Sequence, residues 1–118
     1  MTESVLTRMV TLLKAAGYQV NTQPQESLKP SEMVIIMDDP VLPVETARTY
    51  ILEVKYNIQW LESNIELIPD HLVKVVTTLE TGIDEPTFRV EKNPECKILG
   101  TWYRMMIKVS YKHRVVIV

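Results

Sequence analysis

Two histidines and one cysteine are the residues of this 118-residue chain best suited to nucleophilic or acid–base chemistry: His71, His113 and Cys96. A cysteine beside a histidine can act as a nucleophile with its base. Cys96, however, ends the turn-forming sequence Asn93-Pro94-Glu95-Cys96, and neither a nucleophile elbow nor a family-specific cysteine signature surrounds it. The sequence therefore predicts no catalytic residue and no enzyme activity.

Asp38 and Asp39 are adjacent carboxylates, a residue type that ligates magnesium or calcium. Successive residues at a strand end point in opposite directions, and Pro40 follows at once. We interpret the pair as a solvated turn or as a contact with a partner. One cysteine cannot build a zinc cluster, and three glycines are too few for a phosphate cradle. No metal and no cofactor is expected.

A stripe of cations follows one face of the last predicted strand, with an indole at its end: Trp102, Arg104, Lys108, Lys112 and Arg114. Cations bind phosphate and an indole can stack on a base, so nucleic acid is one interpretation. A solvated strand face and a protein partner are the others. The acidic balance of the whole chain argues against nucleic acid, and sequence-specific recognition of it is not expected.

The last four residues, Val115-Val116-Ile117-Val118, are apolar on both faces of a strand. Such a segment needs cover on both sides, either within its own sheet or from a neighbouring chain. We therefore predict a subunit or partner interface at Val116 and Val118, together with the cationic stripe, Asp38 and Asp39.

Composition indicates one ordinary folded domain over 1–118, with 46% apolar and 24% charged residues. No apolar run approaches the roughly 20 residues of a membrane helix, and the start of the chain does not resemble a secretory signal. Net charge is −2. It is unevenly distributed, since residues 1–85 carry −7 and residues 86–118 carry +5. Such asymmetry favours a partner of opposite charge, which can be another copy of the chain.

Apolar periodicity predicts two helices. Residues 3–16 have apolar side chains at helical spacing, with Thr2 or Ser4 as the N-cap and Gly17 after the end. Residues 69–81 repeat the pattern, with Pro69 in the first turn and Gly82 at the end.

Alternating and apolar segments predict the strands at 33–37, 48–60, 87–91 and 98–113, with a short edge strand near 18–20. The expected order is α–β–β–α–β–β. It lacks a βαβ rhythm, so we predict an α+β single domain with a largely antiparallel sheet and two helices packed on one face.

This element order resembles the tail terminator (tail completion) proteins of long-tailed bacteriophages. The matching stretches cover most of the chain: Val5–Ala16, Met33–Met37, Arg48–Trp60, Asp70–Thr81 and Thr101–His113.

The resemblance implies a non-catalytic virion subunit, made in the host cytoplasm, that forms a six-fold ring. In that family the ring caps the tail tube and offers a surface to the head connector. The expected partners are therefore further copies of the chain, the tail tube protein and the head-connector protein, and no membrane. The alternative is a small ferredoxin-like adaptor or regulatory module, perhaps acting on nucleic acid.

Overall fold

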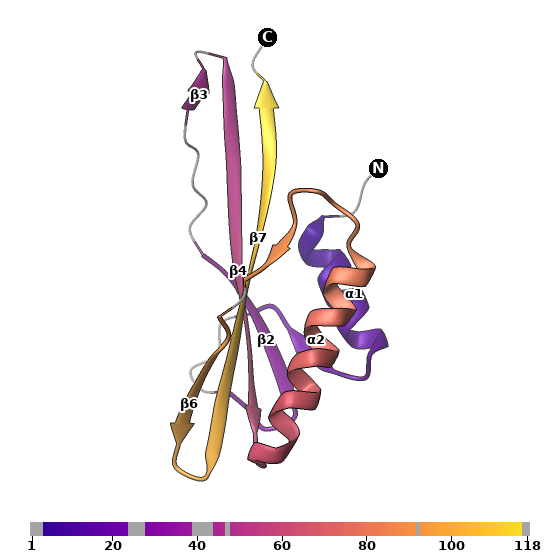
Figure 1. Cartoon of the computed structure of the whole chain (residues 1–118), viewed down its shortest axis with the longest axis vertical. Coiled ribbons are helices and arrows are strands. Elements are labelled where there is room, and N and C mark those ends of the chain that lie inside the picture. The colour runs from indigo at the N-terminus through magenta and orange to yellow at the C-terminus, as the bar shows by residue number, and fades with distance from the viewer. Residues whose placement is uncertain (1–3, 24–27, 39–43, 47, 92, 117–118) are drawn as a thin grey trace.

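The computed structural model describes residues 4–23, 28–38, 44–46, 48–91 and 93–116. Two helices lie on one side of a twisted sheet (Figure 1). The elements follow in this order: α1 Val5–Ala15, β1 Gln19–Asn21, β2 Glu32–Met37, β3 Val44–Thr46, β4 Thr49–Glu62, a 3₁₀ turn η1 Ile65–Leu67, α2 Ile68–Gly82, β5 Arg89–Val90, β6 Glu95–Leu99 and β7 Trp102–Val116.

Both predicted helices form, α1 at Val5–Ala15 and α2 at Ile68–Gly82, within two residues of the predicted bounds. The Ser4 hydroxyl accepts a hydrogen bond from the Thr7 N–H at 3.1 Å and caps α1, and Gly17 follows the helix with a φ of +100°. Pro69 lies in the first turn of α2. The Asn64 side chain accepts from the Glu66 N–H at 2.9 Å and caps η1 instead of α2.

The sheet has the order β1-β2-β4-β7-β5, with β3 added to β4 and β6 added to β7. Among the described strands only β1 and β2 run parallel, and the other pairs are antiparallel. The predicted α+β class with a largely antiparallel sheet is confirmed. The predicted edge strand near 18–20 is β1, whereas the predicted strand at 87–91 shortens to Arg89–Val90.

The strand predicted over 98–113 is wrong at its start. The chain forms a hairpin there, in which β6 pairs with β7 from Leu99↔Trp102 to Glu95↔Met106. Gly100 takes a φ of +61°, which a turn between two strands needs and a strand does not. Strand β3, next to two prolines, was not predicted.

The core lies between the helices and the central strands. Its fully buried residues come from α1, α2, β2, β4 and β7, and they include Met9, Leu13, Val75, Leu79, Met33, Ile35, Ile58, Met105, Ile107 and Val109. Alternate residues of β4 and β7 face the helices, because Ile58 is paired with Ile107 and Tyr56 with Val109. The strict alternation predicted for β4 is therefore what places its apolar side chains in the core.

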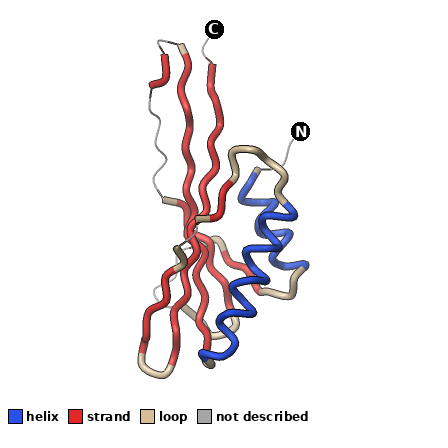
Figure 2. Tube along the Cα trace, in the orientation of Figure 1, coloured by secondary structure: helices blue, strands red, loops and turns tan. Residues whose placement is uncertain are grey.

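The molecule is elongated, with extents of 53 × 25 × 24 Å. Its radius of gyration is 15.6 Å, whereas a compact domain of this length has a radius of about 13.5 Å. The cause is that β4 and β7 continue past the helices at one end, while the β6–β7 hairpin projects at the other (Figures 1 and 2). No described helix is long and apolar enough to cross a membrane.

Candidate assembly surfaces

The part of β4 and β7 that extends past the helices forms a ribbon, defined here as residues 49–53 of β4 and 112–116 of β7. The two strands pair in register from Thr49↔Val116 to Glu53↔Lys112. Strand β3 adds only to the tip, through Val44↔Tyr50 and Thr46↔Thr49. None of the described ribbon residues belongs to the hydrophobic core.

The ribbon nevertheless carries apolar side chains on both of its faces. Tyr50, Leu52 and Val115 share one face and are half-buried. Ile51 and Val116 are on the other, where Val116 is 58% exposed. The predicted interface residue Val116 thus lies at the ribbon's end, whereas Val118 lies outside the described residues.

The predicted cationic stripe is confirmed as one surface. Trp102, Arg104, Lys108, Lys112 and Arg114 alternate with the buried residues of β7, so they share the sheet face that points away from the helices. We call this the basic face. Among the described strand residues and Asp38, it carries seven cations against four acids: Lys55, Arg89, Lys97, Arg104, Lys108, Lys112 and Arg114 against Glu32, Asp38, Glu53 and Glu95.

Asp38 belongs to this face at the end of β2. Its carboxylate accepts a hydrogen bond from Asn57 Nδ2 at 2.7 Å, and its backbone N–H donates to the Lys55 carbonyl at 2.9 Å. Because Asn57 is paired with Lys108, Asp38 is held two strands away from the stripe. Asp39 lies outside the described residues, so the structure does not test the predicted aspartate pair.

The helix side has the opposite charge. Residues 4–16 and 63–88 carry five acids and three cations: Glu66, Asp70, Glu80, Asp84 and Glu85 against Arg8, Lys14 and Lys74. Arg8 and Glu85 form an ion pair, with Arg8 Nη1 3.1 Å from Glu85 Oε1. The uneven charge along the sequence therefore becomes two oppositely charged sides of the folded chain.

A buried polar cluster was not predicted from the sequence. Glu62 is only 5% exposed, although it is charged. Its Oε1 accepts a hydrogen bond from Trp60 Nε1 at 2.9 Å and is also hydrogen-bonded to His71 Nδ1. The predicted strand ends at Trp60, whereas β4 continues to Glu62. The same alternation, extended by two residues, places Glu62 on the core-facing side, and an inward acid is the sequence signal for this cluster.

Tyr18 completes this cluster. Its ring meets His71 edge-on at 6.1 Å between centroids, and Lys74 Nζ lies 5.2 Å from the Tyr18 ring centre. The Tyr18 hydroxyl is buried and has no hydrogen-bond partner among the described residues. Burial raises the pKa of Tyr18, and the negative charge of Glu62 raises it further.

The residues suited to nucleophilic or acid–base chemistry are dispersed. Cys96 is exposed on β6, and neither histidine forms a hydrogen bond with it among the described residues. His113 stacks on Tyr111 in the ribbon region, whereas His71 belongs to the Glu62 cluster. Within the described part of the chain, no group of three or more His, Cys, Asp or Glu side chains is placed to hold a metal ion.

No protein-family model matches this chain, and no curated protein matches it either. Its function is therefore inferred from the ribbon and the two charged sides.

Proposed function

We propose that this chain is a structural subunit that assembles head to tail into a ring. The ring caps the tail tube of a long-tailed phage, as a tail terminator or a head–tail joining subunit. Its partners are further copies of itself, the tail tube protein and the head-connector protein, and its place is the virion. The work of the protein is assembly, and no catalytic step is part of the proposal.

The ribbon is the observation that carries this proposal. A two-stranded ribbon is at best marginally stable in water without a further layer. This one exposes Val116 and leaves Tyr50, Leu52 and Val115 half-buried outside the core. A second chain packed against the ribbon would bury these side chains, with each large aliphatic group contributing about 1.5–3 kcal/mol when fully covered.

The two charged sides support a head-to-tail arrangement. In such an assembly, one surface of each subunit meets a different surface of the next, and the contacts close into a ring when the rotation allows it. An acidic helix side can then meet the basic face of its neighbour, and opposite charges favour this register over face-to-face pairing. The order of the long elements, α1-β2-β4-α2-β7, supports the placement in a phage tail through its resemblance to terminator proteins.

Reversing two charges on the basic face tests the proposal. Lys108→Glu with Lys112→Glu changes the basic face from seven cations against four acids to five against six. We expect the double variant to self-associate at least about tenfold more weakly at low salt, because like charges then oppose each other across the contact. Sedimentation velocity over a concentration series measures this effect.

A matched variant controls for net charge. Lys14→Glu with Lys29→Glu makes the same change in net charge at exposed positions away from the basic face. Because Lys14 belongs to the acidic helix side, we expect this variant to assemble at least as well as the wild type. Unfolding curves should show that both variants remain folded. Normal assembly of the Lys108/Lys112 variant would contradict the proposal, as would equal losses in both double variants.

A second candidate is supported by the basic face itself. Trp102 lies half-buried at one end of the face, so an indole and a row of cations occupy one surface. A nucleic-acid adaptor would use this arrangement to bind phosphates and stack a base. Retained binding of single-stranded nucleic acid at physiological salt, lost on Lys108→Glu with Lys112→Glu, would favour the adaptor over the ring subunit.

A further inference from the structure

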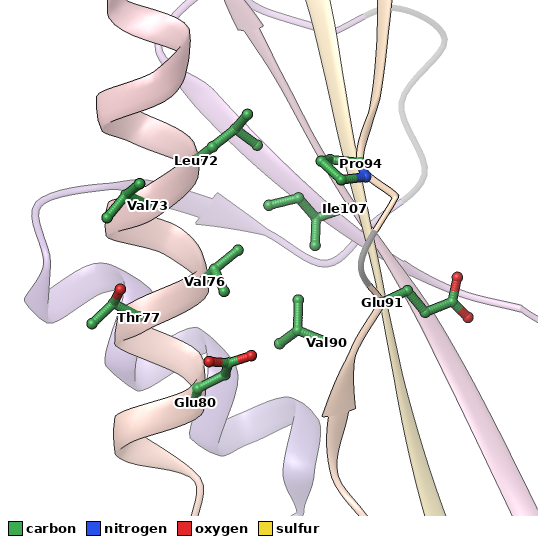
Figure 3. Close-up of a pocket in the computed structure, with 9 residues that line it drawn as sticks. All are labelled: Leu72, Val73, Val76, Thr77, Glu80, Val90, Glu91, Pro94 and Ile107. Atoms are coloured by element: carbon green, nitrogen blue, oxygen red, sulfur yellow. The ribbon is translucent and has the colours of Figure 1, made fainter.

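An apolar groove separates α2 from the edge of the sheet (Figure 3). Leu72 and Val76 of α2 face Val90 of β5 and Ile107 of β7 across it, and its volume is about 360 Å³. Val73 lies on its rim and is 65% exposed. The groove is open to solvent and is large enough to accept apolar side chains from outside the molecule.

The end of this groove is acidic. Glu80 projects from α2 beside Val76 and Val90 (Figure 3). Glu80 also lines an adjoining hollow that contains Asp84. Glu85 is neutralised by Arg8, whereas neither Glu80 nor Asp84 forms an ion pair with a described residue. An occupant that reaches from the groove into this hollow would therefore meet Glu80 and Asp84, with Arg89 also lining the hollow.

The β6–β7 hairpin has the complementary properties. It projects at one end of the molecule (Figure 1), and its tip exposes Ile98 by 74% and Leu99 by 48%. Lys97 and Arg104 lie directly behind the tip as a cross-strand pair, and neither forms an ion pair with a described residue. An apolar tip with two cations behind it matches an apolar groove that has two carboxylates at its end.

The hairpin cannot fill the groove of its own chain. Pro94 lines the groove and immediately precedes β6. Leu99 is five residues further along a paired strand, so it lies about 16 Å from Pro94. Any groove that the tip enters therefore belongs to another molecule.

We propose that the hairpin tip of one copy inserts into the α2–β5 groove of the next. This inference rests on the proposed ring assembly and names one of its contacts. Tip and groove are different surfaces of one chain, so the contact is heterologous and propagates from copy to copy instead of closing a two-fold dimer. Ile98 and Leu99 of one copy fill the apolar groove of the next. Lys97 and Arg104 of the first copy then lie against Glu80 and Asp84 of the second.

Site-specific cross-linking of mixed variants tests this contact. In a Cys96→Ser background, one preparation carries Ile98→Cys and the other carries Val73→Cys, both at exposed positions. After mixing and oxidation, we expect the mixture to form at least about ten times more cross-linked dimer than either preparation alone. Tip meets groove in this contact, and neither surface meets its own copy. Ile98→Cys mixed with Lys29→Cys is the matched control.

The outcomes separate this contact from ring formation itself. Assemblies of unchanged mass in which the mixture cross-links no better than the control would overturn the hairpin contact and leave the proposed function standing. Efficient cross-linking of Ile98→Cys alone would overturn it in favour of a two-fold contact. The absence of any assembly larger than a monomer would overturn both. A second variant, Ile98→Asp, should weaken assembly at least tenfold without altering the unfolding curve.

Discussion

Replacing Leu52 by glutamate should weaken self-association by about 10- to 100-fold while the subunit remains folded. Leu52 lies on the ribbon, paired with His113, and belongs to no part of the core. If a neighbouring chain covers it, the substitution removes about 1.5–3 kcal/mol of apolar burial and places a charge in the contact. Equilibrium sedimentation of the variant and the wild type gives the two dissociation constants directly.

Met37→Glu is the matched control for this substitution. Met37 is 53% exposed at the end of β2, outside the ribbon, so the change in charge and polarity is the same. We expect Met37→Glu to assemble as the wild type does, and both variants to unfold at nearly the wild-type temperature at low concentration. A Leu52→Glu variant that assembles normally would show that the ribbon is no interface.

Replacing Glu62 by alanine should lower the free energy of unfolding by about 3 kcal/mol. The Trp60 indole N–H would lose its acceptor inside the core, and His71 would lose its carboxylate partner. Glu62→Gln keeps an acceptor for Trp60 and should cost less, about 1 kcal/mol. Denaturant unfolding of the three proteins measures these differences. Equal stability of Glu62→Ala and the wild type would contradict the structural role of the cluster.

Tyr18→Phe is expected to have the opposite effect on stability. It removes a buried hydroxyl that has no partner among the described residues, so the change should be neutral or slightly stabilising. It should also change how the free energy of unfolding depends on pH above about 10. Because the folded-state pKa of Tyr18 is raised above 10, the unfolded chain loses this proton first, and stability falls as pH rises beyond about 10. This fall in stability should be smaller in Tyr18→Phe. Part of it should remain, because burial also raises the pKa of Tyr56.

Local patterns in the sequence predict most of the fold. The alternation of β4 and β7 identifies which side chains face the helices, and the Ser4 cap and Pro69 mark the helix starts, because these signals depend only on near neighbours. The hairpin at Gly100 could not be predicted from such local signals. Alternation continues on both sides of the turn, and a single glycine does not show whether the chain reverses.

The candidate surfaces could be predicted only in part. The cations of β7 share a face because of strand periodicity, which the sequence displays. The groove combines Val76 of α2, Val90 of β5 and Ile107 of β7, and only tertiary packing brings these residues together. The Glu62 cluster likewise joins α2 to β4 and to Tyr18 beside β1; strand alternation indicates that Glu62 points inward, but no local pattern identifies His71 and Tyr18 as its neighbours.

The molecular mass of the purified protein over a concentration series, with negative-stain images of the same samples, tests the central claim most directly. A head-to-tail subunit should form species larger than a dimer that close into rings of about six copies. The rings should weaken as salt is raised, because the charged sides are screened. A monomer at every concentration would contradict the claim. So would a stable two-fold dimer, since it would occupy the surfaces that a ring requires.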